Sequence, residues 1–170
     1  MDATLLDKIA AEQAGLFTRA QARACGYSHY QIRRRVRTGE WHQIFGSVLS
    51  RSGVAVTPWV RDRAVYLAVG GSVLAGPSAA RVWDIDVPDR RTCVAVPPHR
   101  HVRATDVVAL RVPLDDEDVV GVDGVLTTSR ARAVFDCLRE TLADNLDDVR
   151  QLALLGVGKM AEIGPHGSHS

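Results

Sequence analysis

Two helix-start signals that follow one another closely constrain the fold of this chain more than any other feature of its sequence. Thr18 is followed three residues later by Gln21, and Ser28 is followed in the same way by Gln31. In such a capping box the hydroxyl accepts a hydrogen bond from the third residue's backbone N–H, and the amide side chain accepts one from the capping residue's own N–H. Gly26, between the boxes, is a residue type at which helices commonly end. The segment therefore predicts two short helices joined by a tight turn, which is a helix-turn-helix.

The flanking sequence extends this motif to a winged helix-turn-helix over residues 1–53. Its predicted helices cover residues 2–14, 19–25 and 28–38. Gly15 and Gly39 stand where the first and third of these helices should end. Residues 40–51 carry aromatic and β-branched side chains on both sides of Gly46 and Ser47, which predicts a β-hairpin. This hairpin would be the wing.

A small mixed α+β domain is predicted over residues 57–155. Thr57 and Pro58 form a helix start. The buried face expected for this helix consists of Val60, Ala64, Leu67 and Ala68. Its arginines are consequently expected to point outward. The predicted fold class is therefore α+β, with an N-terminal winged helix-turn-helix followed by this domain.

The remaining elements follow from hydrophobic periodicity. They are a short helix at 78–83, strands at 92–96, 107–112 and 119–122, and helices at 129–139 and 145–155. The buried face predicted for helix 129–139 contains Val134, Cys137 and Leu138. Residues 156–170 are rich in Gly, Ser and His without periodicity, and we expect this tail to be disordered.

Charge is distributed unevenly along a chain whose net charge is only +1. The segment from Leu16 to Arg63 holds nine arginines and two acidic residues, whereas residues 115–150 are acidic. A basic N-terminal part is typical of proteins that bind polyanions. The chain has no apolar stretch of membrane-spanning length, its first residues do not resemble a secretory signal, and its three cysteines are isolated. We therefore expect a cytoplasmic protein with no membrane association and with reduced thiols.

The second capped helix carries the predicted DNA-binding site. If Ile32 and Val36 face the core, a helical repeat of 100° places Tyr30, Arg34 and Arg37 on the opposite side. The predicted site consists of Arg19, Ser28, Tyr30, Gln31, Arg33, Arg34 and Arg37. Arginine can bridge the two major-groove acceptors of guanine, and glutamine can pair with adenine. Such an arginine run is otherwise a solvated helix face.

Other candidate sites are weaker. Tyr27 and Trp41 are expected to pack in the core or the hairpin, because they do not belong to an aromatic series along a sheet. His99 and His101 lack a nearby thiolate, and the acidic run 115–118 lacks the ligand spacing of a calcium loop. No nucleophile or carboxylate pair has a recognisable catalytic partner. We therefore expect no enzyme activity, no metal and no cofactor.

The stretch from Gly15 to Trp41 resembles the N-terminal winged helix of AbiEi-type antitoxins of type IV toxin-antitoxin systems. Residues 78–83 and 128–136 resemble the middle region of actinobacterial proteins that begin with this module. The resemblance implies a sequence-specific, double-stranded DNA-binding regulator that represses its own operon, with a cognate toxin protein as a second partner. The residues to which the resemblance assigns DNA binding are Tyr30, Gln31, Arg33, Arg34 and Arg37.

The resemblance has one departure and leaves one alternative. Relatives often have a basic residue before the turn glycine of the wing, where this chain has Ile44 and Phe45. Phosphate contacts from the wing are therefore not implied. Many relatives continue into a Vsr-like endonuclease domain, whose metal site needs residues that this sequence does not contain. The alternative is thus a truncated member of that nuclease-fused family, with a residual DNA-binding or protein-interaction role and no catalysis. The sequence leaves the operator and the oligomeric state open.

Overall fold

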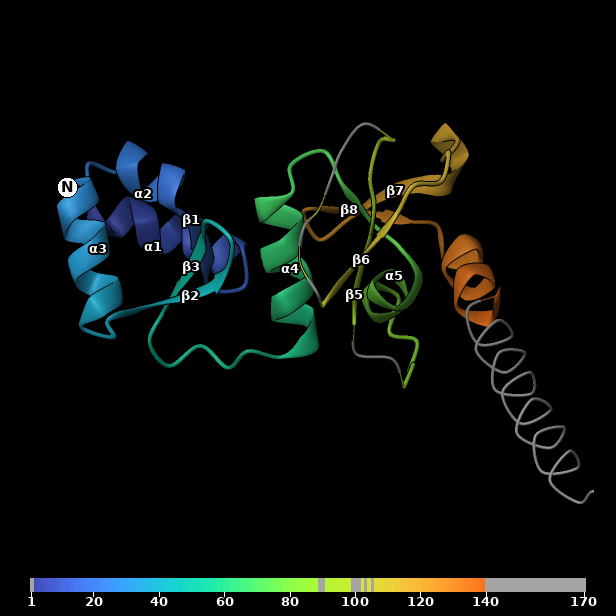
Figure 1. Ribbon diagram of the computed structural model, residues 1–170, viewed down its shortest axis with the longest axis horizontal. Coiled ribbons are helices and arrows are strands. Elements are labelled where there is room, and N and C mark those ends of the chain that lie inside the picture. The colour runs from blue at the N-terminus through green and yellow to red at the C-terminus, as the bar shows by residue number, and fades with distance from the viewer. Residues whose placement is uncertain (1, 89–90, 99–101, 103, 105, 140–170) are drawn as a thin grey trace, which may run out of the picture.

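The computed structural model describes residues 2–88, 91–98, 102, 104 and 106–139, and these fold into helices packed on two separate β-sheets. A three-stranded sheet belongs to the N-terminal part, and a five-stranded sheet belongs to the part that follows (Figure 1). The α+β class predicted from the sequence is confirmed. His99, His101, the predicted helix 145–155 and the tail 156–170 lie outside the described residues.

The N-terminal part is a winged helix-turn-helix. Its helices are α1 (Ala3–Glu12), α2 (Arg19–Ala24) and α3 (His29–Arg37), and its hairpin strands are β2 (Trp41–Phe45) and β3 (Val48–Arg51). The sequence analysis did not include β1 (Leu16–Thr18), which pairs antiparallel with β3 and makes β3 the central strand. A strand of three residues shows no measurable alternation, so its existence depends on this tertiary pairing.

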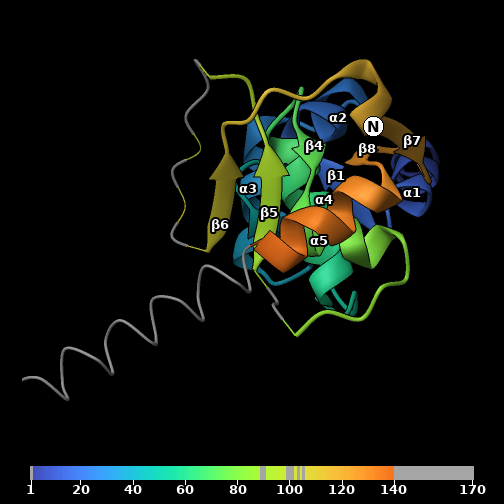
Figure 2. The same cartoon turned by 90° about the vertical axis from the view of Figure 1, so that its right-hand side faces the viewer.

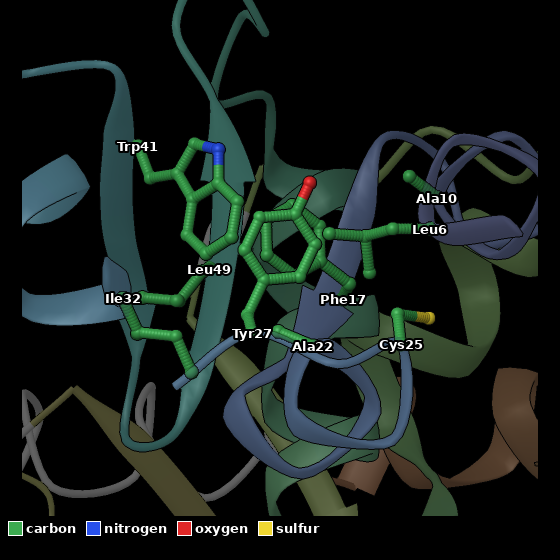
Figure 3. Packing of buried hydrophobic residues seen from close by; sticks show 9 residues of the cluster. All are labelled: Leu6, Ala10, Phe17, Ala22, Cys25, Tyr27, Ile32, Trp41 and Leu49. Atoms are coloured by element: carbon green, nitrogen blue, oxygen red, sulfur yellow. The ribbon is translucent and has the colours of Figure 1, made fainter. Parts of the chain in front are cut away.

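One apolar core holds these elements together. Trp41 is 1% exposed and packs against Phe17 and Tyr27, with ring centroids 4.8 and 5.1 Å away (Figure 3). Leu6 from α1 and Ile32 from α3 pack into the same cluster. The prediction that Tyr27 and Trp41 are packing residues is confirmed. Because α3 is anchored in this core by one side, its other side is left for solvent.

The second part is built on the sheet order β6-β5-β4-β8-β7. Its elements are β4 (Val73–Leu74), α5 (Gly76–Val82), β5 (Thr92–Ala95), β6 (Val107–Leu110), the 3₁₀ turn η1 (Asp116–Asp118), β7 (Val119–Val122), β8 (Val125–Thr128) and a helix at residues 130–139. Strands β4 and β8 were missed by the sequence analysis, because their length and mixed composition give little periodicity. In Figure 2, α5 and residues 130–139 lie in front of the sheet and α4 lies behind it.

Helix α4 (Pro58–Ala68) lies between the two sheets, as Figure 1 shows. Thr57 caps it and Pro58 occupies its first turn, as predicted. Val60 and Ala64 pack with Leu16 and Val48 of the winged helix, so α4 joins the two parts through an apolar contact. The proposed domain boundary at residues 53–57 falls just before this helix, and the division into two domains stays a prediction.

The expectation that the arginines of α4 point outward is wrong for Arg63, which is 6% exposed. Asp62, on the same helix, is fully buried. The carboxylate of Asp62 accepts hydrogen bonds from Ser78 Oγ at 2.8 Å and from Arg81 Nε and Nη2 at 2.7 and 3.1 Å. A buried charge is tolerated when it is paired in this way. Helix α4 therefore buries residues on more than one side, because the winged helix packs on one side of it and α5 on another.

The buried face predicted for helix 129–139 is also wrong. Val134 and Leu138 are 40% and 59% exposed, whereas Ala133 and Asp136 are buried. The reason is an ionic contact, in which Arg132 donates to Asp136 at 3.2 Å and to Asp118 at 2.8 Å. This network turns the polar side of the helix toward η1. Hydrophobic periodicity alone cannot anticipate such a reversal.

Candidate nucleic-acid interface

Helix α3 begins at the predicted capping box. Gln31 N–H donates to Ser28 Oγ at 3.2 Å, and Ser28 N–H donates to Gln31 Oε1 at 2.8 Å. The same arrangement opens α2, where Thr18 and Gln21 form the box. Two of the predicted site residues, Ser28 and Gln31, thus use their side chains to fix the start of α3. The caps set the turn between the two helices, and this turn directs the outer face of α3 away from the core.

The outer face of α3 is polar and cationic. Ile32 is 1% exposed and Val36 is partly buried against the core, as the helical repeat predicts. Tyr30 is 66% exposed, and Arg33, Arg34 and Arg37 are exposed. These four side chains line one shallow hollow of about 310 Å³. In Figure 1, α3 lies at the end of the molecule away from the five-stranded sheet.

The charges of this face are not neutralised within the described part of the chain. The ion pairs there do not include Arg33, Arg34 or Arg37. Three guanidinium groups on one exposed face can therefore act on an anionic ligand. Tyr30 adds a hydroxyl that can donate to a phosphate oxygen.

Arg35 belongs to the same arginine run but has a different environment. Its guanidinium carbon lies 5.1 Å from the ring centroid of Tyr27 and 5.5 Å from that of Trp41. Its Nε lies 3.5 Å from the carboxylate of Glu40. A guanidinium over two aromatic faces is a packing group as well as a charge. Arg35 thus covers the edge of the core instead of lining the hollow.

Arg19 lies on the hairpin side of the winged helix. Its Nη2 donates to Gln43 Oε1 at 3.3 Å, and Gln43 Nε2 donates to the Gly46 carbonyl at 2.8 Å. The structure does not place Arg19 in the wall of the hollow formed on α3. Gln43 was not among the predicted site residues. A register shift between Gln43 and Phe45 breaks the alternation of inward and outward side chains along β2. The sequence pattern therefore could not predict which way the Gln43 side chain points.

The hairpin turn is close to α4. A Cβ atom at Gly46 would lie 3.5 Å from the Cβ of Ala68, and Ile44 and Phe45 pack against the apolar cluster around Val60 and Ala64. The apolar residues Ile44 and Phe45 before the turn therefore serve the contact with α4.

The described residues contain neither a metal-ligand cluster nor a membrane-spanning helix. No group of three or more His, Cys, Asp or Glu side chains there could hold a metal ion. Among the same residues, no helix has the length and apolar character needed to cross a membrane. Cys25 and Cys93 are buried.

A family model matches the N-terminal part of the chain, and a solved structure matches a larger share of it. Residues 5–45 match the model of a family described as transcriptional regulator, AbiEi antitoxin. No curated protein matches the chain. Among solved structures, the RV2827C protein from Mycobacterium tuberculosis is 22% identical, with a TM-score of 0.41 and coverage of 68% of this chain and 47% of that one. The chain thus spans about half the length of that protein.

The matched residues run from α1 to the end of β2 and include both capped helices. The resemblance drawn from the sequence between Gly15 and Trp41 is confirmed. Over residues 5–45 this chain is therefore similar to the AbiEi antitoxin family of transcriptional regulators.

Proposed function

We propose that this protein binds double-stranded DNA sequence-specifically through the outer face of α3 and regulates transcription, including that of its own operon. The observation that carries the proposal is the hollow in which Tyr30 shares one exposed helix face with three arginines that form no ion pair with the described residues. In a helix-turn-helix the second helix enters the major groove. Here that helix is α3, and its cationic side points away from the core that anchors it.

The residue types of this face fit two kinds of DNA contact. A guanidinium can bridge O6 and N7 of guanine, which reads sequence, or pair with phosphate, which positions the protein. Arg34 lies farthest from Ile32 and Val36 around the helix, so it is assigned to a base. Arg33 and Arg37 flank it and are assigned to the phosphate backbone. Arg19, on the hairpin side, is assigned to phosphate outside the groove that α3 occupies.

Fluorescence anisotropy with labelled duplexes tests the proposal. The probes are the region upstream of the protein's own gene and an unrelated duplex of equal length. We expect tighter binding to the upstream region, with a loss on Arg34→Ala. The matched control is Arg130→Ala, which removes one exposed arginine from the helix at residues 130–139. If wild type and Arg34→Ala bound both duplexes equally, the arginines of α3 would be solvent-exposed residues that do not contact DNA.

The antitoxin role is the second part of the proposal. Its support is the description of the family that matches residues 5–45. An antitoxin requires a cognate toxin, and we assign the protein a binding role instead of catalysis. Co-expression with each neighbouring gene, followed by growth assays and co-purification, tests this part. Suppression of a neighbour's toxicity supports it, whereas a downstream frame encoding a nuclease domain would favour the truncated-nuclease alternative.

A further inference from the structure

Arg63 connects three elements at the junction between the winged helix and the five-stranded sheet. Its side chain leaves α4 and is almost wholly buried, with 6% exposure. Nη2 donates to the carbonyl of Glu12 at 2.9 Å, and Nη1 donates to the carbonyl of Asp123 at 2.8 Å. The guanidinium carbon also lies 5.5 Å from the ring centroid of Trp59. One cation thus links the end of α1 to the turn between β7 and β8.

Each of these contacts is chemically specific. Glu12 is the last residue of α1, where helix carbonyls lack intrahelical partners and the helix dipole favours a cation. Asp123 and Gly124 form the turn, with φ of 46° and 76°. A Cβ atom at Gly124 would lie 3.7 Å from Arg63 Nη2, so the turn passes close to the guanidinium. Burial lowers the pKa of Arg63, and Asp123 and Tyr66 partly oppose this effect.

The apolar contact of α4 with the winged helix cannot fix this arrangement by itself. Leu16, Val48, Val60 and Ala64 keep the two parts together, but hydrophobic contact has no preferred direction. Residues 54–57, which connect the parts, contain neither helix nor strand. Two hydrogen bonds from one rigid, planar group do have direction. Arg63 therefore gives this junction the direction that the apolar contact lacks.

This angle determines where negative charge lies relative to α3. Asp115, Asp116 and Glu117 are exposed, and they directly precede β7. In Figure 1, β7 lies on the far side of the molecule from α3. Carboxylates near bound DNA repel its phosphates, and the repulsion grows as salt is lowered. A molecule whose two parts could swing would bring this acidic segment, residues 115–117, closer to the DNA for part of the time.

We propose that Arg63 is a positioning residue that keeps acidic segment 115–117 away from DNA bound on α3. Only the part of this inference that concerns DNA affinity rests on the proposed function. The fixing of the two parts by Arg63 is a property of the free protein and can be measured without DNA.

The experiment uses the full chain with Arg63→Met, which keeps an apolar side chain of similar length and removes both donors. Arg61→Met is the matched control, because Arg61 lies on the same helix but pairs with Asp106 at the surface. Limited trypsin cleavage after Arg51, before the connection, reports whether the two parts separate. Faster cleavage in Arg63→Met than in wild type and Arg61→Met is the expected result.

The second readout is DNA affinity at about 50 and 200 mM salt, at which screening differs. We expect Arg63→Met to bind several-fold more weakly at the lower salt, with a smaller deficit at the higher salt. We then add Asp115→Asn, Asp116→Asn and Glu117→Gln to Arg63→Met and, separately, to wild type. These three changes should raise the DNA affinity of Arg63→Met by a larger factor than that of wild type. A merely structural role would not produce this rescue.

If Arg63→Met does not fold, Arg63→Lys takes its place, because one ammonium keeps the charge but cannot hold both carbonyls. Unchanged cleavage after Arg51 would overturn the proposal. An equal effect of the acidic substitutions in wild type and variant would overturn its DNA component. If wild type does not bind DNA, the proposed function fails, while the cleavage result still decides whether Arg63 fixes the two parts.

Discussion

At the scale of single residues, arginines that look alike in the sequence have different environments. Arg34 is exposed, whereas its neighbour Arg35 covers Tyr27 and Trp41. Arg63 is buried at a junction. The helical repeat separates the first two, because 100° of rotation moves a side chain from one face of α3 to the next. Nothing local distinguishes Arg63 from an exposed arginine, because its two acceptors are backbone carbonyls far away in the sequence.

Arg34→Ala is expected to weaken binding to the preferred duplex by about 1–3 kcal/mol and to relax selectivity at one base pair. The physical reason is the loss of a bidentate contact to a guanine edge. Anisotropy with a set of single-base-pair variants of the site measures it. Unchanged selectivity at every base pair would show that Arg34 does not contact a base.

Arg35→Ala is expected to lower the free energy of unfolding by about 1 kcal/mol, because it removes two aromatic contacts and a surface ion pair. Urea denaturation measures this change. Arg33→Ala removes the same side chain from the neighbouring exposed position and should have little effect on stability. Equal stability of the two variants would contradict the packing role of Arg35.

At the scale of elements, helix starts follow from local chemistry, whereas short strands do not. α2, α3 and α4 all begin at a side chain that accepts from the backbone N–H three residues on. These interactions lie within one turn of chain, so the sequence contains them entirely. β1 and β4 exist because a partner strand pairs with them. Their two or three residues carry no period that could be recognised beforehand.

Ser28→Ala is expected to lower the free energy of unfolding by about 1 kcal/mol, because α3 loses the hydroxyl that caps its first turn. Folded Ser28→Ala should still bind DNA with an affinity close to that of wild type. Thermal unfolding and anisotropy on the same preparation measure the two effects. A large loss of affinity at unchanged stability would instead make Ser28 a direct DNA contact.

Asp62→Ala is expected to destabilise the protein by about 3–5 kcal/mol, because it leaves the guanidinium of Arg81 without its buried carboxylate. Asp86→Ala is the control, because Asp86 is exposed on the segment that follows α5. Chemical denaturation of both variants measures the difference. Similar midpoints for the two would show that the contact between α4 and α5 does not depend on this ion pair.

At the scale of the whole molecule, a net charge of +1 conceals a cationic end and an acidic end. α3 and its arginines lie at one end of the long axis, and β7, next to acidic segment 115–117, lies toward the other (Figure 1). Such a separation orients a protein toward a polyanion more strongly than its net charge suggests.

DNA binding is consequently expected to depend steeply on salt. With about five phosphate contacts, the slope of log K against log salt concentration should lie near −4 to −5, because each contact releases condensed counterions. Anisotropy across a salt series measures it, and Arg37→Ala should reduce the slope by about one. A slope near zero would exclude the phosphate contacts assigned to α3.

The sequence by itself determined the three N-terminal helices, the caps of α2 and α3, the hairpin, and which side of α3 is anchored by Ile32. These features depend on interactions within a few residues and on a helical period that a short segment displays in full. The same local patterns led to the predicted DNA-binding residues, and the family match over residues 5–45 agrees with the fold they imply.

Only the tertiary structure decided what lies on both sides of α4 and which face of residues 130–139 is buried. Asp62 and Arg63 are interior because partners distant in the sequence satisfy them. Val134 is exposed because Arg132, which pairs with Asp136, is also held by Asp118 of η1. The physical reason is the same in each case. A buried charge is stable only beside its partner, and that partner is brought to it by the fold of the rest of the chain.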